Sequence, residues 1–378
     1  MPAPFSPTRN EKRETRNLLS VFLPDAAWRR RFRRRLAQWF ALHARDLPWR
    51  RHRDPYAIWV SEIMLQQTQV ATVEPYFLRF LQAFPTVADL AQADTRPLMR
   101  LWEGLGYYRR AQQLHDAAKM IVREHEGAFP REFEAVRRLP GIGRYTAGAI
   151  LSIAFDARLP ILEANTVRVF SRLLAYDGDT TTAAGQKLLW AMAEAVLPER
   201  GVGQFNQALM ELGSQVCLRR TPRCTECPVA MLCLANARNL QANIPRVKEK
   251  PPAEARHEAA VIVGRKRRVL LLEIPAGQRW AGLWDFPRFA VQAENGPALL
   301  RELTEALRRQ TGIEVRIGRR LAQLTHSVTR FRITLDCYEA EYVRRFSDVP
   351  ISLHWLRPEE LEQYPLCTSG RKLSRMVR

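Results

Sequence analysis

Four cysteines grouped in one short segment constrain the fold of this chain more than any other feature. They have the spacing C-x6-C-x2-C-x5-C, at Cys217, Cys224, Cys227 and Cys233. Thiolates this close together can bind one metal centre, which would close the segment into a loop. Zinc and an iron–sulfur cluster both accept four thiolates, and the spacing alone leaves the two open. The remaining alternative is four free thiols grouped by chance. Cys337 and Cys367 stand far from this group and are interpreted as ordinary thiols.

The charge balance favours a polyanionic partner. The chain has 378 residues and carries 59 Lys and Arg against 39 Asp and Glu, a net charge of +20. Basic side chains that neutralise phosphates release condensed counterions, so nucleic acid is the expected partner. No apolar run reaches the roughly 20 residues of a membrane helix, and residues 1–16 lack an export signal. We therefore expect a cytoplasmic, nucleoid-associated protein with no membrane partner.

The periodicity of the apolar residues changes once along the chain. Residues 1–25 are predicted to form a flexible tail, and residues 26–236 to be helical, because apolar side chains recur at three- and four-residue spacing. Residues 237–256 are rich in Pro, Lys and Glu and are predicted to be a linker. Residues 257–378 show strand patterns and one helical pattern, at 259–263, 269–273, 331–342 and 300–311. The expected fold is therefore a mainly α part followed by an α+β domain.

Two segments of the helical part have informative sequences. The strongly basic run Trp28–Leu36 has apolar residues at every fourth position, which predicts a buried stripe of Trp28, Phe32, Leu36 and Phe40 with solvated arginines around it. Asp54 and Pro55 are a good N-cap and first-turn pair for a helix expected to run through Glu62 and Gln67.

A glycine-rich hairpin is predicted between two helices at Leu139–Ile150. Gly141 and Gly143 let the backbone turn tightly, so that N–H groups before Arg144 and at the start of the next helix face an anion. A DNA phosphate gripped in this way is held without reading sequence. The alternative is a simple interhelical turn.

The hairpin, a later acidic residue and the cysteine spacing together resemble the helix-hairpin-helix DNA glycosylases of the endonuclease III class. Within that class, Trp59–Val70, Gly104–Tyr108 and Phe205–Met210 resemble the adenine DNA glycosylases, the MutY family. The resemblance covers residues 38–236. It implies a helix-hairpin-helix six-helix barrel with a cluster domain, in which the four cysteines hold a 4Fe–4S cluster and shape a basic loop with Arg219, Arg220 and Arg223.

The resemblance assigns the chemistry to two carboxylates. Glu62 would protonate the leaving base and then help to activate water, and its neighbours Ile58, Trp59, Ile63 and Met64 predict an apolar pocket that keeps it protonated. Without the resemblance, a Glu on an amphipathic helix would be interpreted as a surface residue. Glu163 stands where the family has Asp, and would stabilise the sugar cation. Its extra methylene displaces the charge, and Ala164, in place of the family's Gly, could compensate for this.

Further site residues follow from the same resemblance. Tyr145 occupies the position of the lysine that attacks the sugar in bifunctional enzymes, and a phenol cannot form a Schiff base, so hydrolysis without strand cleavage is expected. Tyr145 and Asn165 are expected to support the sugar and the carboxylate. The side chains expected to distort DNA are Gln66, Gln67 and Tyr107, of which Gln67 inserts into the stack and Tyr107 wedges beside the damaged guanine. Core packing is the alternative for Tyr107.

The C-terminal part resembles a Nudix domain that has lost its catalysis. Gly282–Pro287 is similar to the start of that fold, but the helix that should carry the metal carboxylates reads Glu305-Ala-Leu-Arg-Arg-Gln310. Pyrophosphate hydrolysis is therefore not expected, and recognition is. The family's Phe-Ser-His loop, which reads 8-oxoguanine, is here Val328-Thr329-Arg330. Either Thr329 or Arg330 could supply a substitute hydrogen bond.

The resulting expectation is a monomeric, monofunctional DNA N-glycosylase of base excision repair. Its substrate would be adenine mispaired with 8-oxoguanine or guanine in double-stranded DNA. The alternatives are a glycosylase for a different mismatched or damaged base, a catalytically weak mismatch-binding protein, and a structural zinc protein with an inactive Nudix domain.

Overall fold

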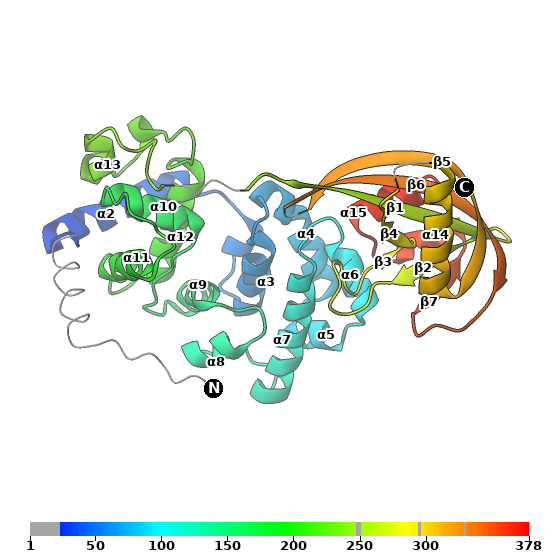
Figure 1. Ribbon diagram of the computed structural model, residues 1–378. Helices are drawn as coiled ribbons and strands as arrows, with labels where there is room; N and C mark the ends of the chain where they lie inside the picture. The colour runs from blue at the N-terminus through cyan, green and yellow to red at the C-terminus, as the bar shows by residue number, and fades with distance from the viewer. Residues whose placement is uncertain (1–22, 247–250, 294–295, 329, 378) are drawn as a thin grey trace, which may run out of the picture. The chain divides into compact units, whose positions relative to one another are not determined.

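The computed structural model describes residues 23–246, 251–293, 296–328 and 330–377 (Figure 1). The chain divides into two compact units. The first is drawn from Met1–Gln67 and Met120–Lys248, and the second from Thr68–Lys119 and Glu249–Arg378. This division cuts through the part of the chain predicted to be helical, because residues 68–119 group with the C-terminal part. The domain boundaries set from the sequence therefore stay a prediction. Of the predicted tail, residues 1–22 lie outside the described residues.

The first unit is helical, as predicted. Its elements are α2 (Ala26–His43), η1 (Pro48–Arg50), α3 (Pro55–Leu65), α8 (Phe133–Arg138), α9 (Arg144–Phe155), α10 (Ala164–Leu173), α11 (Ala183–Ala195), α12 (Val202–Gln215), η2 (Cys224–Glu226), η3 (Ala230–Leu232) and α13 (Leu234–Ala237). Helix α12 packs against α2, α9 and α10, and α3 packs against α9. These contacts bring the ends of α3, α9 and α10 into one region of the unit.

The basic helix α2 buries the apolar stripe predicted from its spacing. Phe32, Leu36 and Phe40 are buried, and Trp28 is half-buried against the same core. Asp25, predicted to belong to the tail, is instead the N-cap of α2 and accepts a hydrogen bond from the Trp28 N–H at 2.7 Å. The arginines are not all simply solvated, since the side chain of Arg33 donates to the carbonyl groups of Ala195 and Val196 at the end of α11.

Helix α3 begins as predicted and ends earlier than predicted. The Asp54 carboxylate accepts from the N–H groups of Tyr56 and Ala57, and Pro55 is the first helical residue. The helix stops at Leu65, so the expectation that it runs through Gln67 is wrong. Gln67 has a φ of 59°, and this left-handed conformation cannot continue a right-handed helix.

The second unit combines helices with one sheet. Its helices are α4 (Val70–Ala83), α5 (Val87–Gln92), α6 (Thr95–Trp102), α14 (Gly296–Thr311), η4 (Pro358–Gln363) and α15 (Thr368–Ser374), and α7 (Arg109–His125) crosses the boundary between the units. The strands are β1 (Glu254–Arg265), β2 (Arg268–Glu273), β3 (Trp284–Asp285), β4 (Arg288–Ala290), β5 (Ile313–Val328), β6 (Phe331–Arg345) and β7 (Leu353–Leu356). No helix in these described ranges has both the length and the apolar character needed to traverse a lipid bilayer.

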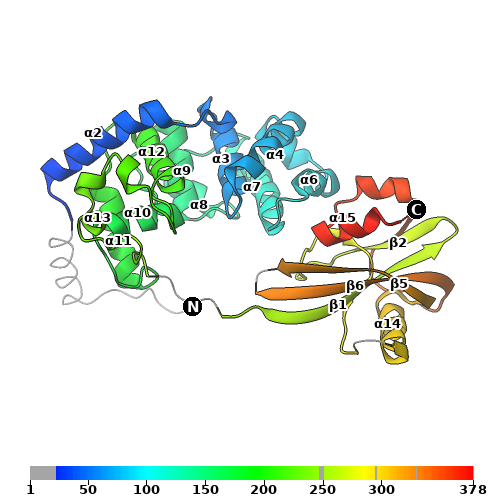
Figure 2. The same ribbon diagram turned by 90° about the horizontal axis from the view of Figure 1, so that it is seen from above.

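The described strands form one mixed sheet with the order β3-β2-β1-β6-β5. Strands β1 and β6 run parallel, and the other pairs are antiparallel, with β4 on β1 and β7 on β2. One face packs on Leu299, Leu303 and Leu307 of α14, and the other on Leu361, Leu366 and Leu373 near the C-terminus. Figure 2 shows α14 and α15 on opposite faces of the sheet. An α+β domain was predicted here and is confirmed.

One local prediction in this unit is wrong, and one strand was not predicted. Residues 254–256 were assigned to the linker, but they open β1, because Glu254 to Arg256 pair with Phe331 to Ile333 of β6. Strand β5 was not predicted, because its irregular polar pattern and its register shifts hide the alternation of a regular strand.

Candidate active site

Glu62 lies in the last turns of α3 and is almost fully buried, with 4 % of its surface exposed. Its neighbours Ile58, Trp59, Ile63 and Met64 are buried as well, so the apolar pocket expected from the sequence is present. The pKa of Glu62 is raised from 4.5 to about 7, chiefly by burial and also by the nearby Glu163, while a hydrogen bond from Tyr145 opposes the rise. Near neutral pH, a large share of this carboxyl group therefore carries its proton.

Tyr145 contacts Glu62 directly. Its phenolic hydroxyl, from the first turn of α9, donates to Glu62 Oε2 at 2.8 Å. Burial and the two carboxylates raise the pKa of Tyr145 well above its ordinary value, so the phenol stays protonated and acts as a donor. A polar contact thus fixes the orientation of the buried acid.

Glu163 is held at the N-terminus of α10, where it is the N-cap residue. Its Oε2 accepts from the Asn165 N–H at 2.7 Å, and its Oε1 accepts from the Thr166 N–H at 2.9 Å. The Thr166 hydroxyl accepts in return from the Glu163 N–H at 2.7 Å, which completes a capping box. Burial raises the pKa of Glu163, and the two backbone N–H groups and Arg168 oppose that rise. The site therefore combines Glu62, a carboxyl group in apolar surroundings, with Glu163, a carboxyl group that accepts two backbone hydrogen bonds.

Asn165 lies beside Glu163 and accepts a hydrogen bond from Arg168, a residue that was not selected from the sequence. The Arg168 guanidinium donates to Asn165 Oδ1 at 2.8 Å, to the Gly213 carbonyl at 2.7 Å and to the Cys217 carbonyl at 2.7 Å. One turn further along α10, Arg172 donates to Cys217 Sγ at 3.2 Å. Helix α10 therefore joins the carboxylate end of the site to the cysteine segment. Thr166 could have been selected, since Glu-x-x-Thr is a reversed capping-box pattern.

The predicted hairpin is the turn between α8 and α9. Gly141 has a φ of 78°, which a side chain would disfavour. Gly143, the N-cap of α9, has an extended conformation, so the prediction that it too is needed for a tight turn is wrong. No side chain caps the helix at Gly143, and the Arg144 guanidinium is 3.7 Å from the Trp190 ring centre. The start of α9 therefore keeps backbone N–H groups available to an anion.

The residues expected to distort DNA lie at two chain reversals. Gln66 is half-buried, and its amide lies 3.5 Å from the Thr146 hydroxyl of α9, while the left-handed Gln67 is exposed. Tyr107 is 52 % exposed and also left-handed, with a φ of 48°. Its exposure argues against core packing, the alternative reading of the sequence.

The four cysteines are half-buried in the segment that follows α12. Burial raises the pKa of Cys227 to about 12, and the other three thiols of the group act on it in the same direction. Across the described ranges, no three His, Cys, Asp or Glu side chains are arranged to hold a metal ion. The donor set itself, four soft thiols in one loop, fits the chemistry of an iron–sulfur cluster. Arg219, Arg220 and Arg223 of this loop are exposed.

Helix α14 of the second unit carries two carboxylates, Glu302 and Glu305. Glu305 is exposed, and Glu302 accepts from the N–H groups of Gln292 and Ala293, which ties the preceding loop to the helix. Strands β5 and β6 meet in a hairpin at Val328 and Phe331. Arg330 pairs with Glu254 at 3.3 Å, and Thr329 lies outside the described residues.

Comparisons with known proteins define the class. The model of the HhH-GPD superfamily of base excision DNA repair proteins matches residues 60–194, and a NUDIX domain model matches residues 258–376. A solved thermostable thymine-DNA glycosylase is 30% identical, with a TM-score of 0.51 over 57% of this chain and 100% of that one. The chain is thus a helix-hairpin-helix DNA N-glycosylase of base excision repair, a hydrolase of N-glycosyl bonds, with a Nudix-like domain.

Curated relatives narrow this class. The human adenine DNA glycosylase is 34% identical over 91% of this chain and 73% of its own length. The adenine DNA glycosylase of Buchnera aphidicola from Schizaphis graminum is 35% identical over 68% of this chain and 75% of its own length. This chain belongs to the adenine DNA glycosylase family.

Proposed function

We propose that this enzyme removes adenine mispaired with 8-oxoguanine or guanine in double-stranded DNA, acting as a monomer. The observation that carries the proposal is the juxtaposition of a buried acid, Glu62, with a second carboxyl group at a helix N-terminus, Glu163. Two carboxylates of unlike environment are what hydrolysis of a glycosidic bond requires. The family membership supports adenine as the base, and the net charge of +20 supports a DNA partner.

The proposed reaction begins when the adenine is turned out of the stack into the pocket beside α3. Protonated Glu62 gives its proton to a ring nitrogen of adenine while the bond between that base and the sugar carbon breaks. Ionised Glu163 stabilises the positive charge that develops on the sugar. Water then bonds to the sugar carbon and gives a proton to the Glu62 carboxylate. The products are free adenine and an abasic site, and Glu62 is protonated again.

Other residues hold the DNA and the acid in place. Tyr145 orients Glu62 through the 2.8 Å hydrogen bond and offers no amine for a Schiff base, so we propose that the strand is not cleaved. Gly141, Gly143 and Arg144 would receive a phosphate at the start of α9. Gln66, Gln67 and Tyr107 would fill the space left by the extruded base.

We also propose that Cys217, Cys224, Cys227 and Cys233 hold a 4Fe–4S cluster, which would serve to shape the loop and not to take part in the reaction. The Arg172 contacts with Cys217 and Cys233 tie the cluster loop to α10. Purified protein should then be brown with the broad visible absorption of such a cluster, and Cys217→Ser should lose both. A colourless protein that binds stoichiometric zinc would contradict the assignment. The cytoplasmic, nucleoid-associated location stays a prediction.

The experiment for the substrate is a single-turnover glycosylase assay on a panel of duplexes. Each carries one labelled adenine opposite 8-oxoguanine, guanine, cytosine or thymine, with and without hot alkali to reveal abasic sites. We expect alkali-dependent cleavage opposite 8-oxoguanine and guanine. Cleavage without alkali would contradict the monofunctional mechanism. Cleavage of a different mispair alone would show that the substrate is not the one proposed. The panel varies the base opposite adenine because Val328 and Arg330 stand where the family has Phe and His. Tight binding without cleavage would indicate that the protein binds mismatches and does not remove a base.

A further inference from the structure

A buried ion pair lies beside the loop that carries Tyr107. We call residues Glu103–Tyr108 the wedge loop. Arg371 of α15 donates from Nε to Glu103 Oε1 at 2.7 Å and from Nη2 to Glu103 Oε2 at 2.9 Å. Both side chains are largely buried, with 14% and 8% of their surface exposed. Glu103 and Arg371 belong to the same compact unit, although 268 positions separate them in the chain.

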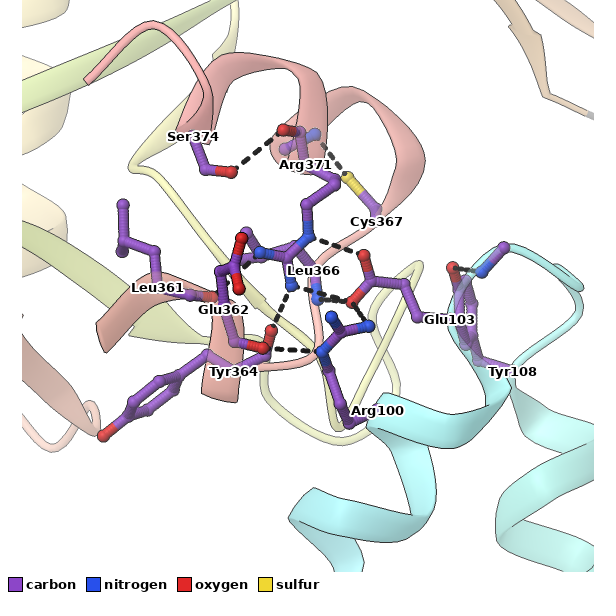
Figure 3. A network of polar contacts seen from close by, with 12 residues as sticks. Arg100, Glu103, Tyr108, Leu361, Glu362, Tyr364, Leu366, Cys367, Arg371 and Ser374 are labelled. Carbon is purple, nitrogen blue, oxygen red and sulfur yellow. Dashed lines mark hydrogen bonds and ion pairs between the residues drawn. The ribbon is translucent and has the colours of Figure 1, made fainter. Parts of the chain in front are cut away.

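The contacts around this pair leave it little freedom (Figure 3). Glu103 Oε2 also accepts from the Leu366 N–H at 3.1 Å. The Arg371 guanidinium donates further to the Leu361 carbonyl at 2.9 Å and to the Tyr364 carbonyl at 2.7 Å. On the same side, Arg100 Nε donates to the Glu362 carbonyl at 2.6 Å. A two-pronged pair with its remaining donors occupied fixes both position and orientation.

The wedge loop has a backbone that needs such support. Gly104, Gly106 and Tyr107 have φ values of 100°, 70° and 48°, and a left-handed tyrosine persists only where its surroundings enforce it. From within the helical part, the Tyr76 hydroxyl donates to the Glu103 carbonyl at 2.7 Å.

The Arg110 side chain supports the loop further along. It donates to the Gly106 carbonyl at 3.2 Å, and its guanidinium lies 5.5 Å from the Tyr107 ring centre. Tyr76 and Arg110 thus act on the loop backbone from the helical part, while Arg371 holds the Glu103 side chain from the C-terminal segment.

We propose that Arg371 is a positioning residue for Tyr107. The Nudix-like domain would then contribute to base removal by fixing the first residue of the wedge loop, and hence the angle at which Tyr107 meets DNA, in addition to any reading of the opposite base. The inference rests on the proposed function, because it takes Tyr107 as the wedge. Loss of the Arg371 side chain leaves the buried Glu103 carboxylate with the Leu366 N–H at 3.1 Å and a longer ion pair to Arg100 Nη1 at 3.5 Å. Without its two-pronged partner the carboxylate is no longer fixed in orientation, and the loop relaxes with it.

The test compares Arg371→Gln with Arg375→Gln, which removes an exposed arginine from the end of the same helix. The full chain is used, with a duplex that carries 2-aminopurine next to the mispaired guanine, whose fluorescence rises when the stack is opened. We expect Arg371→Gln to lose most of the fluorescence rise and to react about tenfold more slowly in single turnover. Arg375→Gln should match the wild type.

The decisive arm repeats Arg371→Gln in a Tyr107→Ala background. If Arg371 acts through Tyr107, the second substitution adds no further loss of rate or fluorescence. Losses that multiply, or an Arg371→Gln variant equal to wild type, would overturn the proposal. Arg371→Lys keeps the charge but not the two-pronged guanidinium, and its rate and fluorescence rise should lie between those of wild type and Arg371→Gln. This variant is the test to use if circular dichroism shows that Arg371→Gln is poorly folded. A wild type that opens the stack but cleaves nothing would count against the proposed function, and not against this inference.

Discussion

The two carboxyl groups of the site are held by opposite means. Glu62 lies in the interior of a helix among apolar side chains and has one side-chain donor, Tyr145. Glu163 lies at the beginning of a helix and receives two backbone N–H groups within 2.9 Å. Dry surroundings favour the neutral acid, whereas N–H groups at a helix N-terminus favour the carboxylate.

The difference shows how two neighbouring carboxyl groups can be given unlike surroundings. Burial raises the pKa of both groups. The Tyr145 hydroxyl opposes the rise at Glu62, whereas two backbone N–H groups and Arg168 oppose it at Glu163. A negative charge on Glu163 in turn makes ionisation of Glu62 harder, which favours the protonated form of Glu62. The Glu163 side chain folds back onto α10 as its N-cap, which places the carboxylate on two backbone N–H groups.

The largest effect is expected from Glu62→Gln. The amide fills the same pocket but cannot give a proton, so the rate of adenine release should fall by about 1,000-fold or more. Affinity for the mispaired duplex, measured by fluorescence anisotropy, should remain within a few-fold of wild type. A variant that retains more than a tenth of the wild-type rate would show that another group is the acid.

A smaller but still large effect is expected from Glu163→Gln. It removes the charge that stabilises the sugar cation, and the rate should fall by about 100-fold. Glu163→Asp is the matched control, because it keeps the charge and remains a good N-cap, and it should lose at most about tenfold. Equal losses in the two variants would show that the negative charge at this position is not what supports the rate.

The buried acid also predicts an unusual dependence of stability on pH. The pKa of Glu62 is raised from 4.5 to about 7 in the folded chain, so the folded state binds this proton more tightly than the unfolded state does. The contribution is present below pH 4.5 and is lost as the pH rises to about 7, which amounts to about 3 kcal/mol. Urea unfolding of Glu62→Gln should therefore show a gain over wild type at pH 8 that disappears at pH 4.5. Parallel stability curves for the two proteins would contradict the burial argument.

The smallest effect is expected from Tyr145→Phe. The phenol stabilises ionised Glu62, so its removal should raise the pKa of Glu62 by about one unit. The rate near neutral pH should change only a few-fold, and the fall of the rate at alkaline pH should move upwards. A pH–rate profile of the variant measures this directly, and an unshifted profile would place the catalytic proton elsewhere.

Sequence reasoning selected the two carboxyl groups as candidates but did not predict the contacts that hold them. The resemblance pointed to Glu62 and Glu163 because their flanking residues are short local motifs. Helix α3 was predicted two residues too long, because the residues around Gln67 do not predict its left-handed conformation. The contacts of Arg168 with Gly213 and of Arg371 with Glu103 join distant parts of the chain, and a lone arginine in a basic chain gives no signal of its partner. Strand β5 was missed for a related reason, because its register shifts break the alternation.

The pH dependence of the single-turnover rate reports whether Glu62 is the group that gives its proton to the adenine. An adenine opposite 8-oxoguanine would be released by wild type, Glu163→Gln and Tyr145→Phe from pH 5 to 9. The account predicts a wild-type rate that falls above a pKa of about 7. That alkaline fall should move to lower pH in Glu163→Gln, because the neighbouring charge is gone, and to higher pH in Tyr145→Phe. A wild-type rate that is constant or rises from pH 7 to 9 would contradict the assignment of Glu62 as the proton donor.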